Sequence, residues 1–216
     1  MIPALPVEVP VAHVPYYSQF TDVSAVEWKK NACGVVSIAM VVDYYSTKNI
    51  SVDTMLSQAL KSGAYLQSAG WTHKGLIDLA AKYGMKGQAY DMTRSTQSAA
   101  FSAFTTQLKT GPVIASVHYK FEPTNPIPHL VVIVGMDKTH VYYNDPATAG
   151  AEKKISIADF KKAWKQKFIV IRPVTAPAKV AVADEPVVLA RAEETNYFAS
   201  FFTRIVPGLF SRGTIG

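Results

Sequence analysis

The sequence contains a single cysteine, Cys33, among its 216 residues. One thiol excludes any internal disulfide and any metal site built from a cluster of cysteines. Long hydrophobic runs are missing too, since no stretch approaches the roughly 18 apolar residues that a membrane-spanning helix requires. Charged residues make up only 18% of the chain, whereas 49% of the residues are hydrophobic. This composition excludes a disordered polyelectrolyte and predicts a folded domain with a real core.

Clustered basic residues are also scarce. The formal net charge is +6, but the lysines are scattered and are not interleaved with aromatic residues as in a nucleic-acid-binding motif. We therefore expect a solubilising surface and no nucleic-acid partner, with a weak preference for anionic surfaces left open. The first residues, "MIPALPVEVPVAHVPYY", lack the basic and apolar regions of a signal peptide. The expectation is a cytoplasmic location by default, with membrane association as an alternative, and neither a metal nor a cofactor.

Hydrophobic periodicity divides the chain into a helical part and a strand-rich part that follows it. Residues 1–20 are punctuated by proline and should be extended. Helical spacing predicts helices over 33–45, 53–61, 73–83, about 96–109 and 157–166. Short β-rich runs predict strands over 111–119, 129–137, 140–146 and 167–173. This order predicts an α+β fold in which a helical lobe packs against an antiparallel sheet within residues 1–173.

The C-terminal residues differ in composition from the rest. Residues 174–195 are rich in Ala, Pro and Val and should form a linker, and residues 196–216 a short tail. Apolar residues in the tail recur at i, i+4 spacing, which predicts a short amphipathic helix. Two interpretations stay open: the tail packs on the domain or on a second copy, or its phenylalanines and arginines contact an anionic membrane surface.

Cys33 stands at the expected start of the helix "CGVVSIAMVVDYY", which is apolar on nearly all sides and should be buried. The thiolate is the reactive form of cysteine, and the N-terminus of a helix favours negative charge. Gly34 directly after it would let another backbone segment approach closely. A lone cysteine can equally be a small buried hydrophobic residue. Whether Cys33 is a nucleophile or a buried hydrophobic residue depends on whether a histidine and a group that orients it lie nearby.

A nucleophilic thiol needs an imidazole that accepts its proton. His129 opens the apolar strand of "NPIPHLVVIVG" behind a loop that two prolines stiffen. The segment "VYYNDP" follows one hairpin later, so Asn144 or Asp145 should lie beside this histidine and orient it, with Asp137 as a more distant alternative. Gln19 in "YYSQF" is a side-chain amide that could donate to an oxyanion.

The other four histidines have weaker positions. His13 lies in the proline-rich lead-in, and His140 at an expected hairpin turn. His118 is near the end of a strand, and His73 opens the helix over 73–83, either at the surface or in a cleft. Unlike His129, none of them opens a strongly apolar strand behind a loop that prolines stiffen.

In this order, the motifs resemble those of the papain-like cysteine peptidases. More narrowly, they are similar to the bacteriocin-processing, double-glycine leader peptidase type of cysteine peptidase family thirty-nine and its stand-alone relatives. The resemblance spans roughly residues 13–173 and includes "GWTHKGLIDLAAKYG" and "LKTGPVIASV". It implies a papain-like fold and a peptide or protein substrate cleaved through an acyl-enzyme. It also implies Cys33 as nucleophile, His129 as base, Asp145 as orienting acid and Gln19 in the oxyanion hole.

Two positions depart from the pattern of this family. Val35 follows Gly34 where members often have proline, which only pre-forms the first helical turn. Pro128 precedes His129 where a small residue is common, and this could alter the exposure of the histidine. An acyltransferase or amidase would use the same groups, and a non-catalytic peptide-binding module would have the same fold. These stay as alternatives to a peptidase.

Overall fold

The structure is a computed structural model that describes residues 8–47, 49–67 and 69–174. The predicted linker, apart from Val174, and the predicted tail with its membrane-binding alternative lie outside these residues. Within the described ranges, no helix combines the length and the apolar character needed to cross a bilayer.

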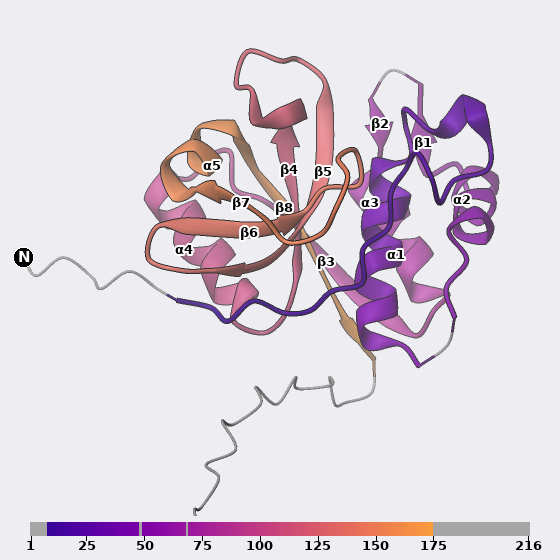
Figure 1. The fold of residues 1–216 in the computed structure, drawn as a ribbon, viewed down its shortest axis with the longest axis horizontal. Coiled ribbons are helices and arrows are strands. Elements are labelled where there is room, and N and C mark those ends of the chain that lie inside the picture. The colour runs from indigo at the N-terminus through magenta and orange to yellow at the C-terminus, as the bar shows by residue number, and fades with distance from the viewer. Residues whose placement is uncertain (1–7, 48, 68, 175–216) are drawn as a thin grey trace, which may run out of the picture. The chain divides into compact units, whose positions relative to one another are not determined.

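A six-stranded sheet forms the centre of the described structure, with the strand order β3-β8-β4-β5-β6-β7 (Figure 1). Every neighbouring pair in it is antiparallel. A separate two-stranded ribbon joins β1 and β2. The strands are β1 (Tyr65–Leu66), β2 (Gly70–Trp71), β3 (Met85–Asp91), β4 (Val113–His118), β5 (Pro128–Met136), β6 (His140–Asn144), β7 (Lys153–Ser156) and β8 (Trp164–Pro173).

The helices differ in how they begin. They are η1 (Val26–Trp28), α1 (Cys33–Tyr45), α2 (Val52–Lys61), α3 (His73–Ala81), α4 (Gln97–Leu108), η2 (Tyr119–Phe121) and α5 (Ile157–Ala163). Each of α2 to α5 follows a Ser or Thr whose side chain accepts a hydrogen bond from a backbone N–H of the first turn. The residue before α1 is Ala32, which provides no such cap. The first-turn N–H groups of α1 therefore have no side-chain acceptor at this position.

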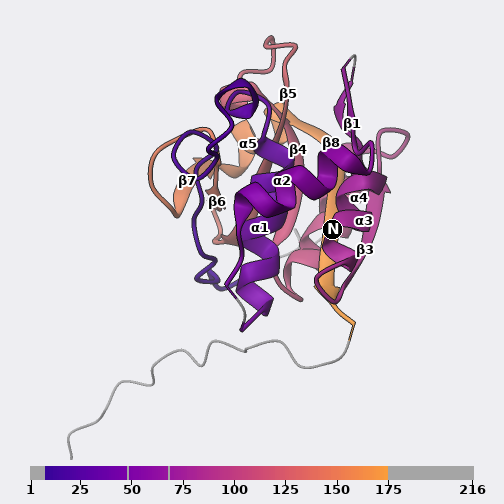
Figure 2. The same cartoon turned by 90° about the vertical axis from the view of Figure 1, so that its right-hand side faces the viewer.

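Helices cover both faces of the sheet, because successive residues of a strand point to opposite faces. Ile114 and Leu130 belong to the hydrophobic core shared with α1, α2 and α3. Their neighbours Val113 and Val131 belong to a second, more aromatic core with α4 and α5. Figure 2 looks onto the first side and shows α1 and α2 in front of the sheet. The predicted α+β fold is thus confirmed, with a helical layer on each face.

Two strands of the sheet, β3 and β7, were not predicted, and one predicted helix is shorter than expected. β3 lies between α3 and α4, so strands and helices alternate more than expected. β7 was not predicted, and α5 ends at Ala163 because β8 already begins at Trp164. β3 and β7 are the two edge strands of the sheet, and most of their residues are not buried. An edge strand needs little apolar alternation, which is the signal that sequence patterns provide.

The N-terminal segment is extended, as predicted, and runs beside β5. Val9 and Met136 exchange two backbone hydrogen bonds of 2.7 and 2.9 Å, and the N–H of Ala12 donates to Val134 at 2.8 Å. A Cβ atom at Gly135 would lie 2.6 Å from the Cα atom of Val11. Gly135 therefore lets the N-terminal segment pass close to β5. The hydrogen bonds to β5 in turn fix the start of the residues that follow this segment.

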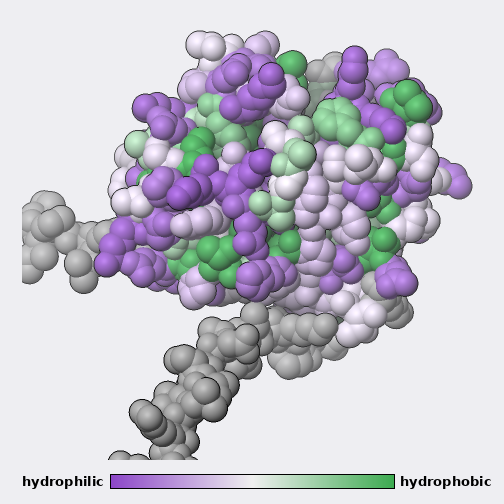
Figure 3. All heavy atoms as spheres, in the orientation of Figure 1, coloured by the Kyte–Doolittle hydropathy of each residue, from purple (hydrophilic) through white to green (hydrophobic). Residues whose placement is uncertain are grey.

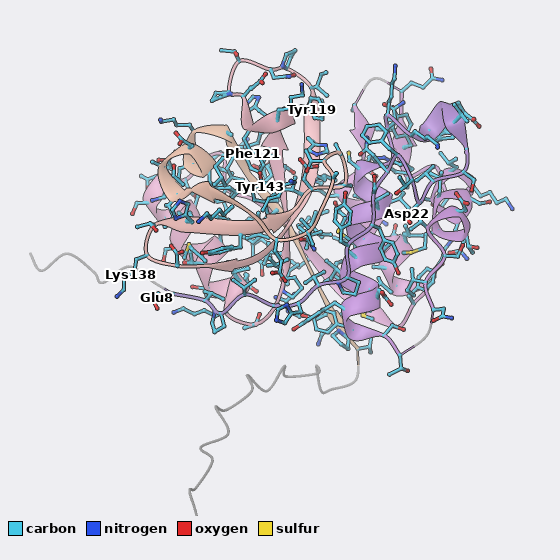
Figure 4. The ribbon with its side chains drawn as sticks, in the orientation of Figure 1. Glu8, Asp22, Tyr119, Phe121, Lys138 and Tyr143 are labelled. Atoms are coloured by element: carbon cyan, nitrogen blue, oxygen red, sulfur yellow. The ribbon has the colours of Figure 1, made fainter. Side chains whose placement is uncertain are left out.

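One face of the surface can be compared directly by hydropathy. On the face seen in Figure 3, hydrophobic side chains lie in small separate patches among hydrophilic ones. Glu8 and Lys138, labelled in Figure 4, form an ion pair of 3.3 Å on this surface. Because both side chains are more than half exposed, the pair contributes little to stability.

Candidate active site

Cys33 is the first residue of α1 and is partly exposed, while the nine residues that follow it are all buried. The buried helix holds the sulfur at a fixed place at the edge of the core. A Cβ atom at residue 34 would lie 2.7 Å from Cγ of Trp71. Gly34 therefore admits a tryptophan side chain, and not another backbone segment as the sequence suggested.

His129 and Asp145 lie on neighbouring strands and are joined by a short hydrogen bond. His129 is the second residue of β5, and Asp145 follows Asn144, the last residue of β6. Nε2 of the imidazole lies 2.6 Å from Oδ1 of the carboxylate, and each side chain is only 3% exposed. The N–H of Ala147 donates to the same Oδ1 at 2.8 Å. The carboxylate is thus held in place while it binds one end of the ring.

The surroundings of His129 favour its protonated form. Burial disfavours the imidazolium, but hydrogen bonds to Asp145 and to Cys33, with the charges of both, outweigh this and raise the pKa of His129 from 6.5 to about 9. The imidazole therefore interacts with the carboxylate on one side and with the sulfur on the other. At neutral pH it is a cation beside Cys33.

Gln19 is brought to the same place by the N-terminal segment. Its backbone N–H donates to the carbonyl of Pro146 at 2.8 Å, directly after Asp145 in the chain. The side chain is almost fully buried, at 3% exposure for the whole residue. Its Oε1 has no hydrogen-bond partner among the described residues. The amide group of Gln19 thus lines the site, and its oxygen accepts no hydrogen bond from the described residues.

The two rival orienters of His129 have other partners. Asn144 is fully buried; its Nδ2 donates to the carbonyl of Val14 at 3.0 Å, and its Oδ1 accepts from the N–H of Glu152 at 2.7 Å. Asp137 accepts hydrogen bonds from Tyr142 and from the turn before β6. Of the three candidates, Asp145 is the one that hydrogen-bonds to His129.

A pocket of about 690 Å³ connects these groups. Gln19, Cys33 and His129 line it together, although they come from the N-terminal segment, α1 and β5. Trp71 of the short ribbon forms another part of the wall. The indole lies edge-on to Tyr65 at 5.0 Å between ring centroids, which makes this wall rigid and aromatic.

Residues 11–167 match the Peptidase_C39 like family. The chain belongs to this family. Its sequence is 28% identical over 144 residues to the pediocin PA-1 transport/processing ATP-binding protein PedD of Pediococcus acidilactici. That stretch is 67% of this chain but only 18% of PedD. The resemblance that the motifs indicated is therefore confirmed, for a region that corresponds to a small part of this relative.

Solved structures agree on the fold. A putative C39-like peptidase from Bacillus anthracis superimposes with a TM-score of 0.56 at 20% identity, over 79% of this chain and all of that one. A double glycine motif protease from an AMS/PCAT transporter, in complex with the leader peptide, gives 0.51 at 22% identity, over 77% and 97% of the two chains. At these identities the likeness establishes the papain-like fold of peptidase family C39.

Tyr119 is a pocket residue of this C39-like domain that sequence reasoning missed. It directly follows β4 and begins η2, and its ring meets that of His129 edge-on with 5.2 Å between centroids. Figure 4 shows it at the loop between β4 and β5. Antiparallel pairing of Val117 with His129 brings it there. No sequence signal marks it, because the contact arises from strand register.

His73 is a second imidazole in the pocket of the C39-like domain, and of its two expected locations the cleft is the right one. Its Nε2 lies 3.0 Å from Oγ of Ser116 on β4. Burial lowers the pKa of His73, and the positive charge of Lys167 lowers it further. This imidazole is therefore neutral where His129 is charged.

Proposed function

We propose that this chain hydrolyses peptide bonds through a thiol nucleophile. The observation that carries the proposal is the buried 2.6 Å hydrogen bond between Asp145 and His129, with Cys33 as the second partner of the same imidazole. A base that is oriented by a carboxylate and bonded to a nucleophile is the arrangement that acyl transfer requires. Membership of a peptidase family supports the same reaction class.

In the first step, the proton of Cys33 has passed to His129, and Sγ attacks the carbonyl carbon of the scissile bond as the thiolate. A C–S bond forms, and the carbonyl electrons move to the oxygen, which becomes an oxyanion. Gln19 is the proposed side-chain donor to this oxygen, together with the uncapped backbone N–H at the start of α1. The imidazolium of His129 then protonates the leaving amine as the C–N bond breaks, which leaves a thioester.

In the second step, the neutral imidazole accepts a proton from water as the water oxygen attacks the thioester. The C–S bond breaks, the carboxylic acid product leaves, and Cys33 regains its pairing with the imidazolium. Asp145 stays ionised throughout; it fixes the tautomer and the orientation of His129.

The proposed substrate is a peptide or an unstructured protein segment. A neighbour of the same fold has been solved with a leader peptide bound, and the pocket of about 690 Å³ has the size of a site for a few side chains. The transport activity named for PedD is not part of the proposal, because the matched region is 18% of that protein.

Cys33→Ala tests the proposal. The full chain is incubated with a peptide library, and cleavage products are identified by mass spectrometry. We expect the natural chain to cleave members of the library and the variant to cleave none, while circular dichroism shows the same fold. Cleavage that survives in Cys33→Ala contradicts the assignment. Rapid alkylation of Cys33 without cleavage of any peptide favours the amidase, transferase or binding-module alternatives.

A further inference from the structure

The pocket wall has a strongly asymmetric charge. Three lysines line it, Lys30, Lys165 and Lys167. Among the described residues that line it, none is Asp or Glu. A cleft lined by charges of one sign concentrates ligands of the opposite sign. The charge of the wall thus bears on which ligands the pocket accepts.

Lys165 lies in an irregularity of β8, two residues before the regularly paired Lys167. Ser116 of β4 pairs with Lys167, but the next residue, Val117, pairs with Trp164, so residues 165 and 166 are extra residues on the β8 side. Gln166 within this bulge has a φ of 54°, a conformation that is uncommon for residues other than glycine. A bulge of this kind redirects side chains, often beside active sites.

Lys165 has no carboxylate partner within ion-pair distance in the described part of the chain. Lys167, by contrast, contacts Asp91 at 2.9 Å. Burial lowers the pKa of Lys165, and the nearby charge of Lys167 lowers it further. A partly buried cation beside a second cation is unfavourable unless a negative group joins them. The fold therefore keeps an uncompensated positive charge in the pocket.

We propose that Lys165 and Lys167 form a carboxylate-binding subsite in the pocket that contains Cys33. On the proposed function, this subsite selects peptides that carry a carboxylate next to the scissile bond. The carboxylate would belong either to an Asp or Glu side chain or to the end of the peptide. Lys165 contributes more than Lys167, because Asp91 already neutralises part of the charge of Lys167.

A matched pair of small alkylating agents tests the subsite without any need for cleavage. Iodoacetate and iodoacetamide both alkylate a thiol by attack of sulfur on a CH2 group with loss of iodide; iodoacetate transfers a carboxymethyl group and iodoacetamide a neutral carbamoylmethyl group of nearly the same size. The ratio of their rates at Cys33 reports how the pocket favours an anion. The imidazolium of His129 also raises this ratio, so the readout is the change between variants of the full chain.

We expect Lys165→Met to lower the iodoacetate-to-iodoacetamide ratio by about tenfold, and Lys167→Met by a smaller factor. Lys165→Glu should lower it more than Lys165→Met. The control is Lys86→Met, which removes an exposed lysine of β3 that does not line the pocket. A ratio that is the same in Lys165→Met and Lys86→Met overturns the subsite. Unchanged iodoacetamide rates show that the variants keep the site intact.

Three peptides of one sequence then distinguish the sources of the carboxylate. One carries Glu beside the scissile bond and ends in an amide, one carries Gln there and ends in an amide, and one carries Gln and ends in a free carboxylate just after the bond. Preference for the first assigns a side-chain carboxylate, and preference for the third a terminal one. Either preference must be lost in Lys165→Met. Equal cleavage of all three by the natural chain overturns the proposal.

The two tests separate the subsite from the proposed function. If no peptide is cleaved but the alkylation ratio falls in Lys165→Met, the subsite stands and the peptidase proposal fails. If peptides are cleaved without acidic preference and the ratio is unchanged, the peptidase proposal stands and the subsite fails.

Discussion

The pocket contains two histidines whose surroundings have opposite effects. His129 is held between a carboxylate and a thiol, and its pKa is raised to about 9. His73 is bonded to the neutral hydroxyl of Ser116 and lies near Lys167, and its pKa is lowered. Burial disfavours the charged form of both rings. For His129, the partners Asp145 and Cys33 outweigh the effect of burial. The hydroxyl partner of His73 is neutral, so burial lowers the pKa of that ring.

The comparison shows that position in a pocket does not by itself make a histidine a general base. Only one of these two rings is bonded to a carboxylate on one side and to the sulfur of Cys33, the proposed nucleophile, on the other. The wall that includes His73 and the two β8 lysines is suited to contact substrate, whereas the wall that includes His129 is suited to move protons.

Replacement of the two histidines should give the largest contrast. His129→Ala should lower kcat by about 10⁴-fold or more, because both proton transfers are lost. His73→Ala should change kcat by less than about tenfold, because a neutral ring bonded to a hydroxyl takes no proton in the proposed reaction. Steady-state kinetics on one peptide measures both. A larger loss for His73→Ala than for His129→Ala would reverse the assignment of the base.

The adjacent residues Asn144 and Asp145 should affect different properties. Asp145→Ala should lower kcat by about 10²–10⁴-fold, since His129 loses its orienting partner. Asn144→Ala leaves the carbonyl of Val14 and the N–H of Glu152 without their partner, which should cost about 1–3 kcal/mol of unfolding free energy.

Urea denaturation and kinetics on the same samples separate the two effects. The result that contradicts the assignment is a folded Asn144→Ala protein with a lower kcat than Asp145→Ala.

Gln19→Ala should lower kcat by about 10²–10³-fold, the usual effect of removing one donor to an oxyanion. Alkylation of Cys33 by iodoacetamide develops no oxyanion, so its rate should be nearly unchanged. Gln19→Glu, which keeps the size but removes the amide donor, is the matched control and should behave like Gln19→Ala in turnover. Equal losses of turnover and of alkylation would mean that Gln19 supports the structure of the site instead.

The pH dependence should give the smallest and most gradual effect. In the proposed reaction the imidazolium of His129 protonates the leaving group, so kcat should fall about tenfold per pH unit above pH 9. The same proton is bound more tightly in the folded chain than in the unfolded chain, where the pKa is about 6.5. This group therefore stabilises the fold fully below pH 6.5, and its contribution declines as the pH rises to 9.

Asp145→Asn removes the main cause of the raised pKa, so its high-pH limb should begin at a lower pH. Rate profiles of the two proteins between pH 6 and 10, and Tm measured over the same range, test this. Identical high-pH limbs in both proteins would show that another group titrates.

The fold could be predicted from the sequence where an element is buried and periodic. The helix Cys33–Tyr45 has its predicted ends, because an apolar run that begins at a cysteine and ends at polar residues leaves little freedom. The edge strands β3 and β7 were missed, because they are stabilised by pairing on one side more than by burial. The helix expected over 157–166 ends three residues early because the chain enters β8 instead.

The candidate site could be predicted in its chemistry but only partly in its geometry. Cys33 and His129 stand out because each is a functional side chain near the start of a helix or strand, whereas Gln19 is a loop residue whose role came from the family resemblance; all three line one pocket. The choice between Asn144 and Asp145 was open in the sequence. It depends on which of two adjacent side chains, which point in different directions, faces β5.

The sequence by itself therefore determined which chemical groups the chain has and in which order they occur, because local patterns of apolar and turn residues set the elements that carry them. Only the tertiary structure decided what surrounds each group. Strand register placed Tyr119 against His129 and Asp145 within 2.6 Å of it, and Lys165, which lies in the register shift between β4 and β8, lines the same pocket. Register depends on contacts between distant segments, which no local pattern encodes.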